Sequence, residues 1–101
     1  MLKSAVDECI EESQYEDCSE TKYGQIGDWD LSAVTDMSAI FYLHLFFNQD
    51  LSKWDVSAVT NMVSTFNGAC AFNQDLSKWD VSAVTNMRMM FHHVSAFNQD
   101  L

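Results

Sequence analysis

Apolar and polar residues alternate along this chain in a pattern whose period changes within each short unit. Trp54 and Val56 are separated by polar residues, which is the period-2 pattern of a short strand with one buried side. Val59, Met62 and Phe66 then follow steps of three and four, the spacing of a short helix with one inward face. The pattern therefore predicts a strand followed by a helix in each unit.

The unit recurs at a step of 25 residues, and residues 48–62 are identical to residues 73–87. The recurring tryptophans are Trp29, Trp54 and Trp79. A stack of equivalent coils explains such a step, because each position then meets its own copy one coil away. Leu51, Trp54 and Val56 also follow the L-x-x-L-x-L spacing of leucine-rich repeats. We therefore predict an α/β fold, a leucine-rich-repeat-like right-handed solenoid of strand–helix coils with a parallel sheet on one side.

The amino-terminal segment lacks the repeat and carries a helical pattern instead. Leu2, Val6, Cys9 and Ile10 fall on one helical face, and acidic residues occupy the other faces. This predicts a cap helix over about residues 2–14 that covers the first coil. The predicted organisation is a capping helix and loop over residues 1–22, three repeats over about 23–47, 48–72 and 73–97, and the start of a fourth within 23–101.

The carboxyl end shows no comparable cap in the sequence, since Leu101 takes the first apolar position of a fourth coil. The open face of the last coil should therefore be exposed. Two interpretations follow: the chain is a fragment of a longer array, or it is a short protein that self-associates through that face.

The charge balance excludes several classes of partner. Five Lys and Arg stand against fifteen Asp and Glu, a formal net charge of −10. Nucleic-acid binding requires the opposite sign, and an anionic membrane surface is disfavoured for the same reason. The longest apolar run, 39–47, is interrupted by His44 and is far shorter than the roughly 20 residues of a spanning helix. We expect no nucleic-acid partner and no membrane insertion, and no leader sequence is visible after Met1.

The repeat unit resembles a known family. The string LSKWDVSAVTNM at 51–62, closed by Ala-Phe-Asn-Gln-Asp, is similar to BspA-type surface-protein repeats, 25-residue units of unknown function in mycoplasma lipoproteins and some unicellular eukaryotes. The opening segments at 2–9, 17–19 and 26–30 also resemble the eukaryotic versions. The resemblance implies a leucine-rich-repeat-like protein located outside the cell or on its surface, with a role in binding or adhesion rather than catalysis.

The cysteines offer two different interpretations. A disulfide between Cys9 and Cys18 would tie the cap helix to the first coil, and the alternative is two separate thiols. The family resemblance favours the disulfide. Cys70 aligns with Leu45 and Ser95, a variable position, so we predict a free and partly buried thiol rather than an intermolecular bridge.

The histidines lie near Cys70 in the repeat register. His44, His92 and His93 are expected at the same edge of successive coils, where a Cys/His metal site is conceivable. No Cys-x-x-Cys or His-x-x-x-His spacing supports it. We interpret them as exposed loop side chains and predict no metal.

Charged residues form columns on the outer face of the predicted sheet. The columns contain Asp30, Asp55 and Asp80, and beside them Asp28, Lys53 and Lys78. Like charges on strands about 4.8 Å apart repel. Hydrogen bonds from Ser, Thr or amides of adjacent coils would offset this repulsion, and bound Ca²⁺ is the alternative. A further column, Asp50, Asp75 and Asp100, lies in the turn and is predicted to have an Asx role.

No catalytic motif accompanies these columns. The chain has no Gly-rich phosphate loop, no Gly-x-Ser-x-Gly elbow and no acid/base pair in context, so we predict neither an enzyme nor a cofactor. The aromatic residues are interpreted as core rather than a sugar platform. The leading hypothesis is a non-catalytic recognition or adhesion module that presents the charged columns to a protein or glycan. The alternative is a structural spacer of a cell envelope or wall, with or without Ca²⁺ on the Asp column.

Overall fold

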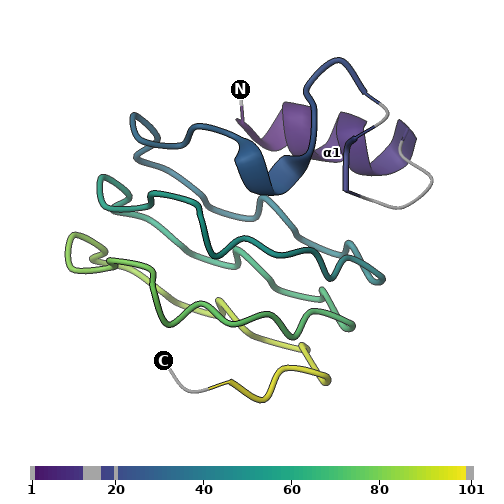
Figure 1. Cartoon of the computed structure of the whole chain (residues 1–101). Coiled ribbons are helices and arrows are strands. Elements are labelled where there is room, and N and C mark those ends of the chain that lie inside the picture. Colours follow the sequence, from purple (N-terminus) through teal and green to yellow (C-terminus); the bar gives the residue numbers. More distant parts are fainter. Residues whose placement is uncertain (1, 13–16, 20, 100–101) are drawn as a thin grey trace.

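The chain winds into three stacked coils below a single helix in the computed structural model, which describes residues 2–12, 17–19 and 21–99 (Figure 1). The described residues contain one α-helix, α1 (Leu2–Glu12), and one short 3-10 helix, η1 (Ile26–Asp28). We name the coils by residue: coil 1 is 23–47, coil 2 is 48–72 and coil 3 is 73–97. The whole molecule, α1 included, measures 33 × 30 × 21 Å along its principal axes.

The predicted α/β solenoid of strand–helix coils is wrong. The described residues form no strand or sheet, only two isolated parallel bridges that join Asp36 to Asn61 and Asn61 to Asn86. The helix predicted over 59–66 is also absent. Left-handed backbone recurs at matching positions in the coils, which are Ala39, Ser64 and Met89, then Leu43, Gly68 and His93. A right-handed helix cannot pass through such residues, so each coil turns repeatedly instead.

Consecutive β-turns satisfy part of the backbone of each coil. In coil 2 the amide of Thr65 donates to Met62 O at 3.3 Å, and that of Asn67 donates to Ser64 O at 3.1 Å. The amide of Ala69 then donates to Phe66 O at 2.9 Å. These turns keep the three-and-four spacing of the apolar residues without helical geometry.

The intervening amides join one coil to the next. The hydrogen bonds from coil 2 to coil 3 run from the amides of Met62, Ser64, Phe66 and Gly68 to the carbonyls of Asn86, Arg88, Met90 and His92, at 2.9–3.0 Å. Coil 1 donates to coil 2 in the same way from Met37, Ala39, Phe41 and Leu43. We call these rows the inter-coil ladder. Its donors all point from the lower-numbered coil to the higher, so the stack has a direction.

Aromatic rings fill the centre of the stack, as the sequence predicted. Phe66 stacks on Phe41 at 5.3 Å and on Phe91 at 5.6 Å between ring centroids. Trp54 and Trp79 stack at 6.4 Å. Each of these two indole rings also donates to the preceding coil, from Trp54 Nε1 to Ile26 O and from Trp79 Nε1 to Leu51 O. The core therefore interlocks successive coils through both rings and hydrogen bonds.

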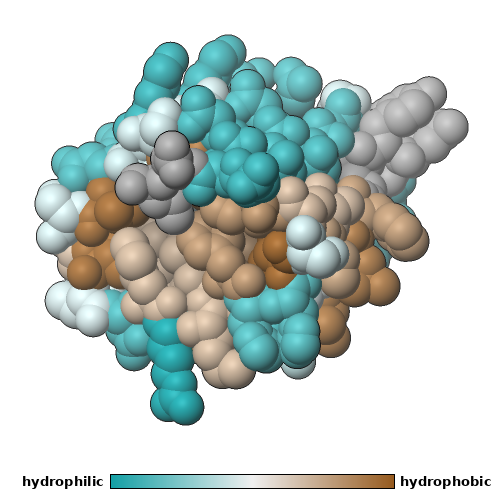
Figure 2. Space-filling model, turned by 90° about the horizontal axis from the view of Figure 1, so that it is seen from below, coloured by the Kyte–Doolittle hydropathy of each residue, from teal (hydrophilic) through white to brown (hydrophobic). Residues whose placement is uncertain are grey.

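The helix α1 covers the coil 1 end of the stack (Figure 1). Val6, Cys9 and Ile10 are its buried residues, which are three members of the predicted apolar face. The predicted residues 13–14 of this helix lie outside the described residues. The opposite end is formed by coil 3, and viewed from below it exposes an apolar band (Figure 2).

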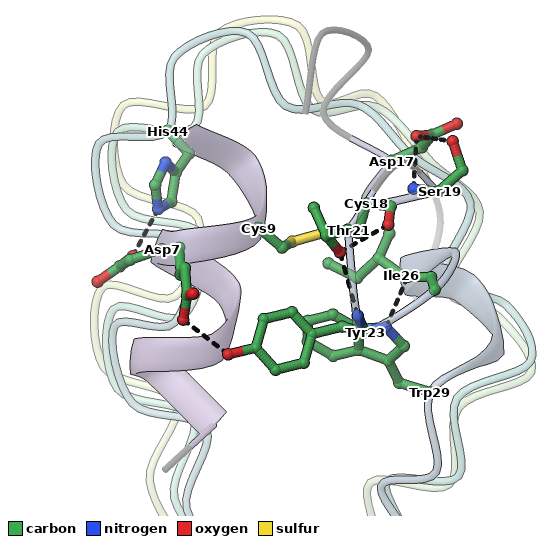
Figure 3. The surroundings of a disulfide bond; sticks show 12 residues. Asp7, Cys9, Asp17, Cys18, Ser19, Thr21, Tyr23, Ile26, Trp29 and His44 are labelled. Atoms are coloured by element: carbon green, nitrogen blue, oxygen red, sulfur yellow. Dashed lines mark hydrogen bonds and ion pairs between the residues drawn. A yellow bond between two sulfur atoms is a disulfide. The ribbon is translucent and has the colours of Figure 1, made fainter. Parts of the chain in front are cut away.

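The predicted disulfide between Cys9 and Cys18 is confirmed (Figure 3). Two side-chain contacts tie α1 to coil 1 beside it: Tyr23 Oη donates to Glu8 Oε2 at 2.6 Å, and His44 Nε2 lies 2.7 Å from Asp7 Oδ1. The hydrogen bond to Glu8 raises the pKa of Tyr23, so its hydroxyl stays protonated. Of the helices described, none has the length and apolar character needed to cross a membrane.

Candidate functional site

The predicted charged columns project from turns rather than from a sheet. Their residues, all exposed, are Asp28, Asp30, Lys53, Asp55, Lys78 and Asp80. We call this surface the turn face. A face of paired strands was expected here, and that expectation is wrong because the backbone on both sides of each tryptophan is closed by local turns. In coil 2, for example, the amide of Trp54 donates to Leu51 O and that of Val59 to Val56 O.

The aspartates beside the tryptophans are each fixed by the serine two residues later. Asp55 Oδ1 accepts from the Ser57 amide at 3.0 Å and from the Ser57 hydroxyl at 2.6 Å. Asp30 and Asp80 make the same pair of bonds to Ser32 and Ser82. Serine donors were predicted, but they come from the same coil and not from an adjacent one. Each coil therefore holds its own carboxylate in position.

These hydrogen bonds keep the carboxylates ionised. The Ser57 hydroxyl and then its amide hold the pKa of Asp55 below its ordinary value. The negative charges of Asp30 and Asp80 raise the pKa of Asp55, but by less than the hydrogen bonds to Ser57 lower it. The three carboxylates therefore interact electrostatically along the stack. The result is a column of fixed negative charges along the stack.

The lysines add positive charges beside this column. Lys53 Nζ lies 3.8 Å from Asp28 Oδ1, and the two side chains are 79% and 62% exposed. An ion pair this exposed to solvent contributes little to the stability of the fold. Lys53 and Lys78 both lower the pKa of Asp50, after the larger effect of its bonds to Ser52. The turn face therefore carries an alternating pattern of charge rather than one sign.

The turn-lining aspartates have the Asx role that the sequence predicted. Asp50 Oδ1 accepts from the Ser52 amide, and Asp75 Oδ1 accepts from the Ser77 amide, both at 2.8 Å. Asp100 lies outside the described residues. A hollow of about 110 Å³ is lined by Asp50 and Gly27, among others. A Cβ added at Gly27 would lie only 2.7 Å from Asp50 O. The hollow is smaller than the sites that enclose drug-sized molecules.

A larger and more open hollow joins the turn face to α1. It has a volume of about 550 Å³. Its lining consists of Leu2, Ala5, Tyr23, Gly24, Gln25, Asp28, Trp29, Asp30 and Leu31. The half-buried rings of Tyr23 and Trp29 lie 5.7 Å apart within it. Trp29 Nε1 donates to Gly24 O, and the hydroxyl of Tyr23 donates to Glu8, so both rings are fixed in place. Two carboxylates and two aromatic rings thus meet at one place.

The histidines and Cys70 do not converge on a metal site in the described part of the chain. No group of three or more His, Cys, Asp or Glu side chains there is placed to hold a metal ion. His44 pairs with Asp7. The rings of His92 and His93 contact each other, with their centroids 3.9 Å apart. Cys70 is half-buried, as predicted, and its Sγ contacts Gly68 O within the same chain.

Sequence reasoning missed the contacts that place α1 on coil 1. It assigned His44 to an exposed loop, whereas the structure pairs it with Asp7 and buries most of it. A signal was present, because His44 stands where the other coils have the apolar residues Ala69 and Val94. A polar residue at an otherwise apolar repeat position indicates a contact particular to that coil.

Comparisons with known proteins identify a family but no function. No curated protein and no solved structure matches the chain. A family model described as Mycoplasma protein of unknown function, DUF285, matches residues 11–101, which include all three coils. The match supports the sequence resemblance at the level of this family and says nothing of BspA itself. The chain therefore belongs to the DUF285 family of mycoplasma proteins of unknown function.

Proposed function

We propose that this protein is a non-catalytic recognition module, outside the cell or on its surface, that binds basic side chains of a protein partner. One observation carries the proposal: Asp28 and Asp30 line the same hollow as the fixed rings of Tyr23 and Trp29. A lysine or arginine is attracted both to the face of an aromatic ring and to carboxylates. The hollow therefore offers two kinds of contact to one cation.

The arrangement favours binding because its groups are already held in place. Ser32 fixes Asp30, Glu8 holds Tyr23 and the Gly24 carbonyl accepts from Trp29. Fixed groups lose little conformational freedom when a partner binds, which leaves more of the interaction free energy as affinity.

The repeat extends this site along the stack. Asp55 and Asp80 continue the column of carboxylates, and Lys53 and Lys78 lie beside it. A partner with several basic groups at matching intervals would bind more tightly than a single group, since later contacts form within the complex. The lysines would repel basic groups placed at other positions, which favours one register.

A protein partner fits these contacts better than a glycan. Stacking on sugars needs exposed ring faces, but Trp54 and Trp79 are only 3% and 8% exposed. Coils 2 and 3 therefore present charged side chains to a partner, and the rings of these two tryptophans are not accessible to it. The spacer role remains the outcome to expect if the turn face binds nothing.

The test compares two variants with equal net charge, using a lysine 20-mer as the probe in calorimetry. D30N/D55N/D80N removes the column but keeps the turns, because Asn61 and Asn86 already make the same bond to an amide two residues on. E11Q/E12Q/D36N removes three exposed charges elsewhere. We expect the first variant to bind about tenfold more weakly and the control to change less than about twofold.

Three outcomes would overturn the proposal. Equal weakening in both variants would mean that the probe senses net charge alone. Absence of binding to the unaltered protein would favour the spacer. If a panel of neutral glycans binds and D30N/D55N/D80N abolishes that binding, the partner class is a glycan and not a basic protein. Matching thermal melts of the variants are required as evidence of folding.

A further inference from the structure

The hollow between α1 and coil 1 combines an apolar wall with a charged rim. Its apolar and aromatic side chains, all half-buried or buried, are Leu2, Ala5, Tyr23, Trp29 and Leu31. The carboxylates that line it belong to Asp28 and Asp30, which are exposed residues. A cation that enters the hollow therefore meets negative charge at the rim and apolar surface further in.

The two aromatic rings of the wall form a corner rather than a flat stack. The centroids of Tyr23 and Trp29 lie 5.7 Å apart, and the ring planes are inclined by 57° (Figure 3). An aromatic ring attracts a cation that lies within about 6 Å of its centroid. One rounded cation at the open side of the corner can satisfy this distance for both rings. A planar guanidinium stacks flat on one ring only, because the second plane is inclined to the first.

One cation of the chain already uses this chemistry beside the hollow. Lys22 Nζ lies 5.2 Å from the centroid of the Tyr23 ring and 3.8 Å from Glu8 Oε1. Lys22 lies outside the lining of the hollow, and its side chain is 73% exposed. A ring and a carboxylate thus already attract one ammonium group here, and the hollow offers the same pair of groups to a second one.

The polar groups of both rings are already engaged in hydrogen bonds. Trp29 Nε1 donates to Gly24 O at 3.0 Å, and the Tyr23 hydroxyl donates to Glu8 Oε2 at 2.6 Å. An unmodified lysine ammonium has three N–H donors, and each costs free energy if it is buried without an acceptor. A trimethylated ammonium keeps the positive charge but has no N–H group, and its methyl groups gain free energy against apolar walls.

We propose that this hollow binds a trimethylated lysine of a protein partner in preference to an unmodified lysine. The inference rests on the proposed function, in which the same hollow takes basic side chains, and it names the chemical form of the side chain. The positive charge is attracted to the two rings and to the carboxylates of Asp28 and Asp30. The methyl groups fill the apolar part of the hollow, where an N–H donor would lack an acceptor.

The charge at the rim argues against a choline headgroup, which carries the same trimethylammonium group. In phosphocholine a short linker joins the ammonium to a phosphate, whose negative charge would lie near Asp28 and Asp30. Like charges at short separation repel. A lysine side chain brings no negative charge of its own, so a protein partner fits the rim better.

The test is a titration of the ¹⁵N-labelled full chain, followed at the indole Nε1–H signal of Trp29. The three ligands are acetylated and amidated single residues: trimethyllysine, lysine, and the neutral isostere of trimethyllysine in which carbon replaces the charged nitrogen. We expect trimethyllysine to bind at least about fivefold more tightly than either of the others. The neutral isostere separates attraction of a charge to the rings from burial of the methyl groups, and this comparison needs no variant.

Two tyrosine variants then test whether the ring corner is the site. Tyr23→Leu removes one ring but keeps an apolar side chain, so the preference for trimethyllysine over lysine should fall below about twofold. Tyr42→Leu is the matched control, since Tyr42 lies in the same coil, is 45% exposed and stands outside the lining of the hollow. It should keep the fivefold preference. The amide spectra of both variants without ligand report whether they fold.

Four results would overturn the proposal. Equal affinity for trimethyllysine and lysine would mean that the hollow takes basic side chains without selecting methyl groups. Equal affinity for the neutral isostere would mean that apolar burial alone drives binding. Phosphocholine binding as tightly as trimethyllysine would make a choline headgroup the ligand. The last is an unchanged Trp29 signal with every ligand.

The proposed function fails on a different observation, which is equal weakening of lysine 20-mer binding in D30N/D55N/D80N and in its control variant. Equal affinity for lysine and trimethyllysine leaves that function standing. The two failures are therefore distinguishable.

Discussion

Coil 2 and coil 3 share fifteen identical residues in a row, yet the same side chains have different surroundings. Met62 is fully buried and Met87 is 44% exposed. Val56 is buried, whereas Val81 is only half-buried. The difference comes entirely from what lies below each coil. Burial in a stack is therefore set by the next coil as much as by the sequence of the coil itself.

The tryptophans show the opposite behaviour. Trp54 and Trp79 are 3% and 8% exposed, although one lies in an inner coil and one in the last. Each donates to a carbonyl of the preceding coil, Ile26 O or Leu51 O. The indole rings therefore depend on the coil before, whereas the ladder residues depend on the coil after. This asymmetry is the main physical property of the stack.

The largest expected contrast is between Phe66 and Phe91. Phe66 is fully buried with ring neighbours in both adjacent coils, and Phe91 is half-buried at the end. We expect Phe66→Ala to lower the free energy of unfolding by about 3–5 kcal/mol and Phe91→Ala by about 1–2 kcal/mol. Denaturant unfolding followed by fluorescence measures both. Equal losses would contradict the difference in packing.

The methionines test the comparison within identical sequence. Met62→Ala should reduce the free energy of unfolding by about 3 kcal/mol, because the side chain is fully buried. Met87→Ala removes a side chain that is 44% exposed, so we expect a loss below about 1 kcal/mol. The same unfolding assay applies. A loss at Met87 as large as that at Met62 would mean that coil 3 is covered in solution.

The disulfide sharpens the comparison between the two ends. Replacing Cys9 and Cys18 by serine should lower the free energy of unfolding by about 2–3 kcal/mol, since the crosslink that ties α1 to coil 1 is lost. Cys70→Ser is the control and should change it by less than about 0.5 kcal/mol. Calorimetric melts give both values. A larger effect from Cys70 would mean that this thiol is not free.

The smallest effect concerns pH. Hydrogen bonds from serine lower the pKa values of Asp30, Asp55 and Asp80 in the folded protein. Their stabilisation is present above the ordinary aspartate pKa of about 3.9 and is lost as pH falls through the lower folded values. Melting temperature should therefore drop below about pH 4, and D30N/D55N/D80N should drop less. Identical pH profiles would argue against these bonds.

The repeat and its core were predictable because burial has a simple pattern in sequence. The 25-residue step of Trp, Phe and Met places each ring on its copy, and this holds for any stacked coil. The Asx roles of Asp50 and Asp75 also followed from residue type and position, and the family resemblance favoured the disulfide. These features depend on which side chains face inward or close a turn, not on the type of backbone between them.

The strand and helix of each coil were not predictable for a physical reason. Steps of three and four bring Val59, Met62 and Phe66 inward both in a helix and in a row of turns. The deciding factor is left-handed backbone, and in coil 1 it falls on Ala39 and Leu43, residue types that give no local signal. Gly68 was the visible hint, since glycine adopts this conformation readily. The column residues are exposed, as predicted, but they project from turns and not from a sheet.

Amide hydrogen exchange tests the directional ladder most directly. We expect slow exchange at Met62, Ser64, Phe66 and Gly68, whose amides are bound to coil 3. We expect fast exchange at the corresponding amides of coil 3, which are those of Met87, Met89, Phe91 and His93, in dilute solution. Equal protection of the two rows would contradict the direction of the ladder.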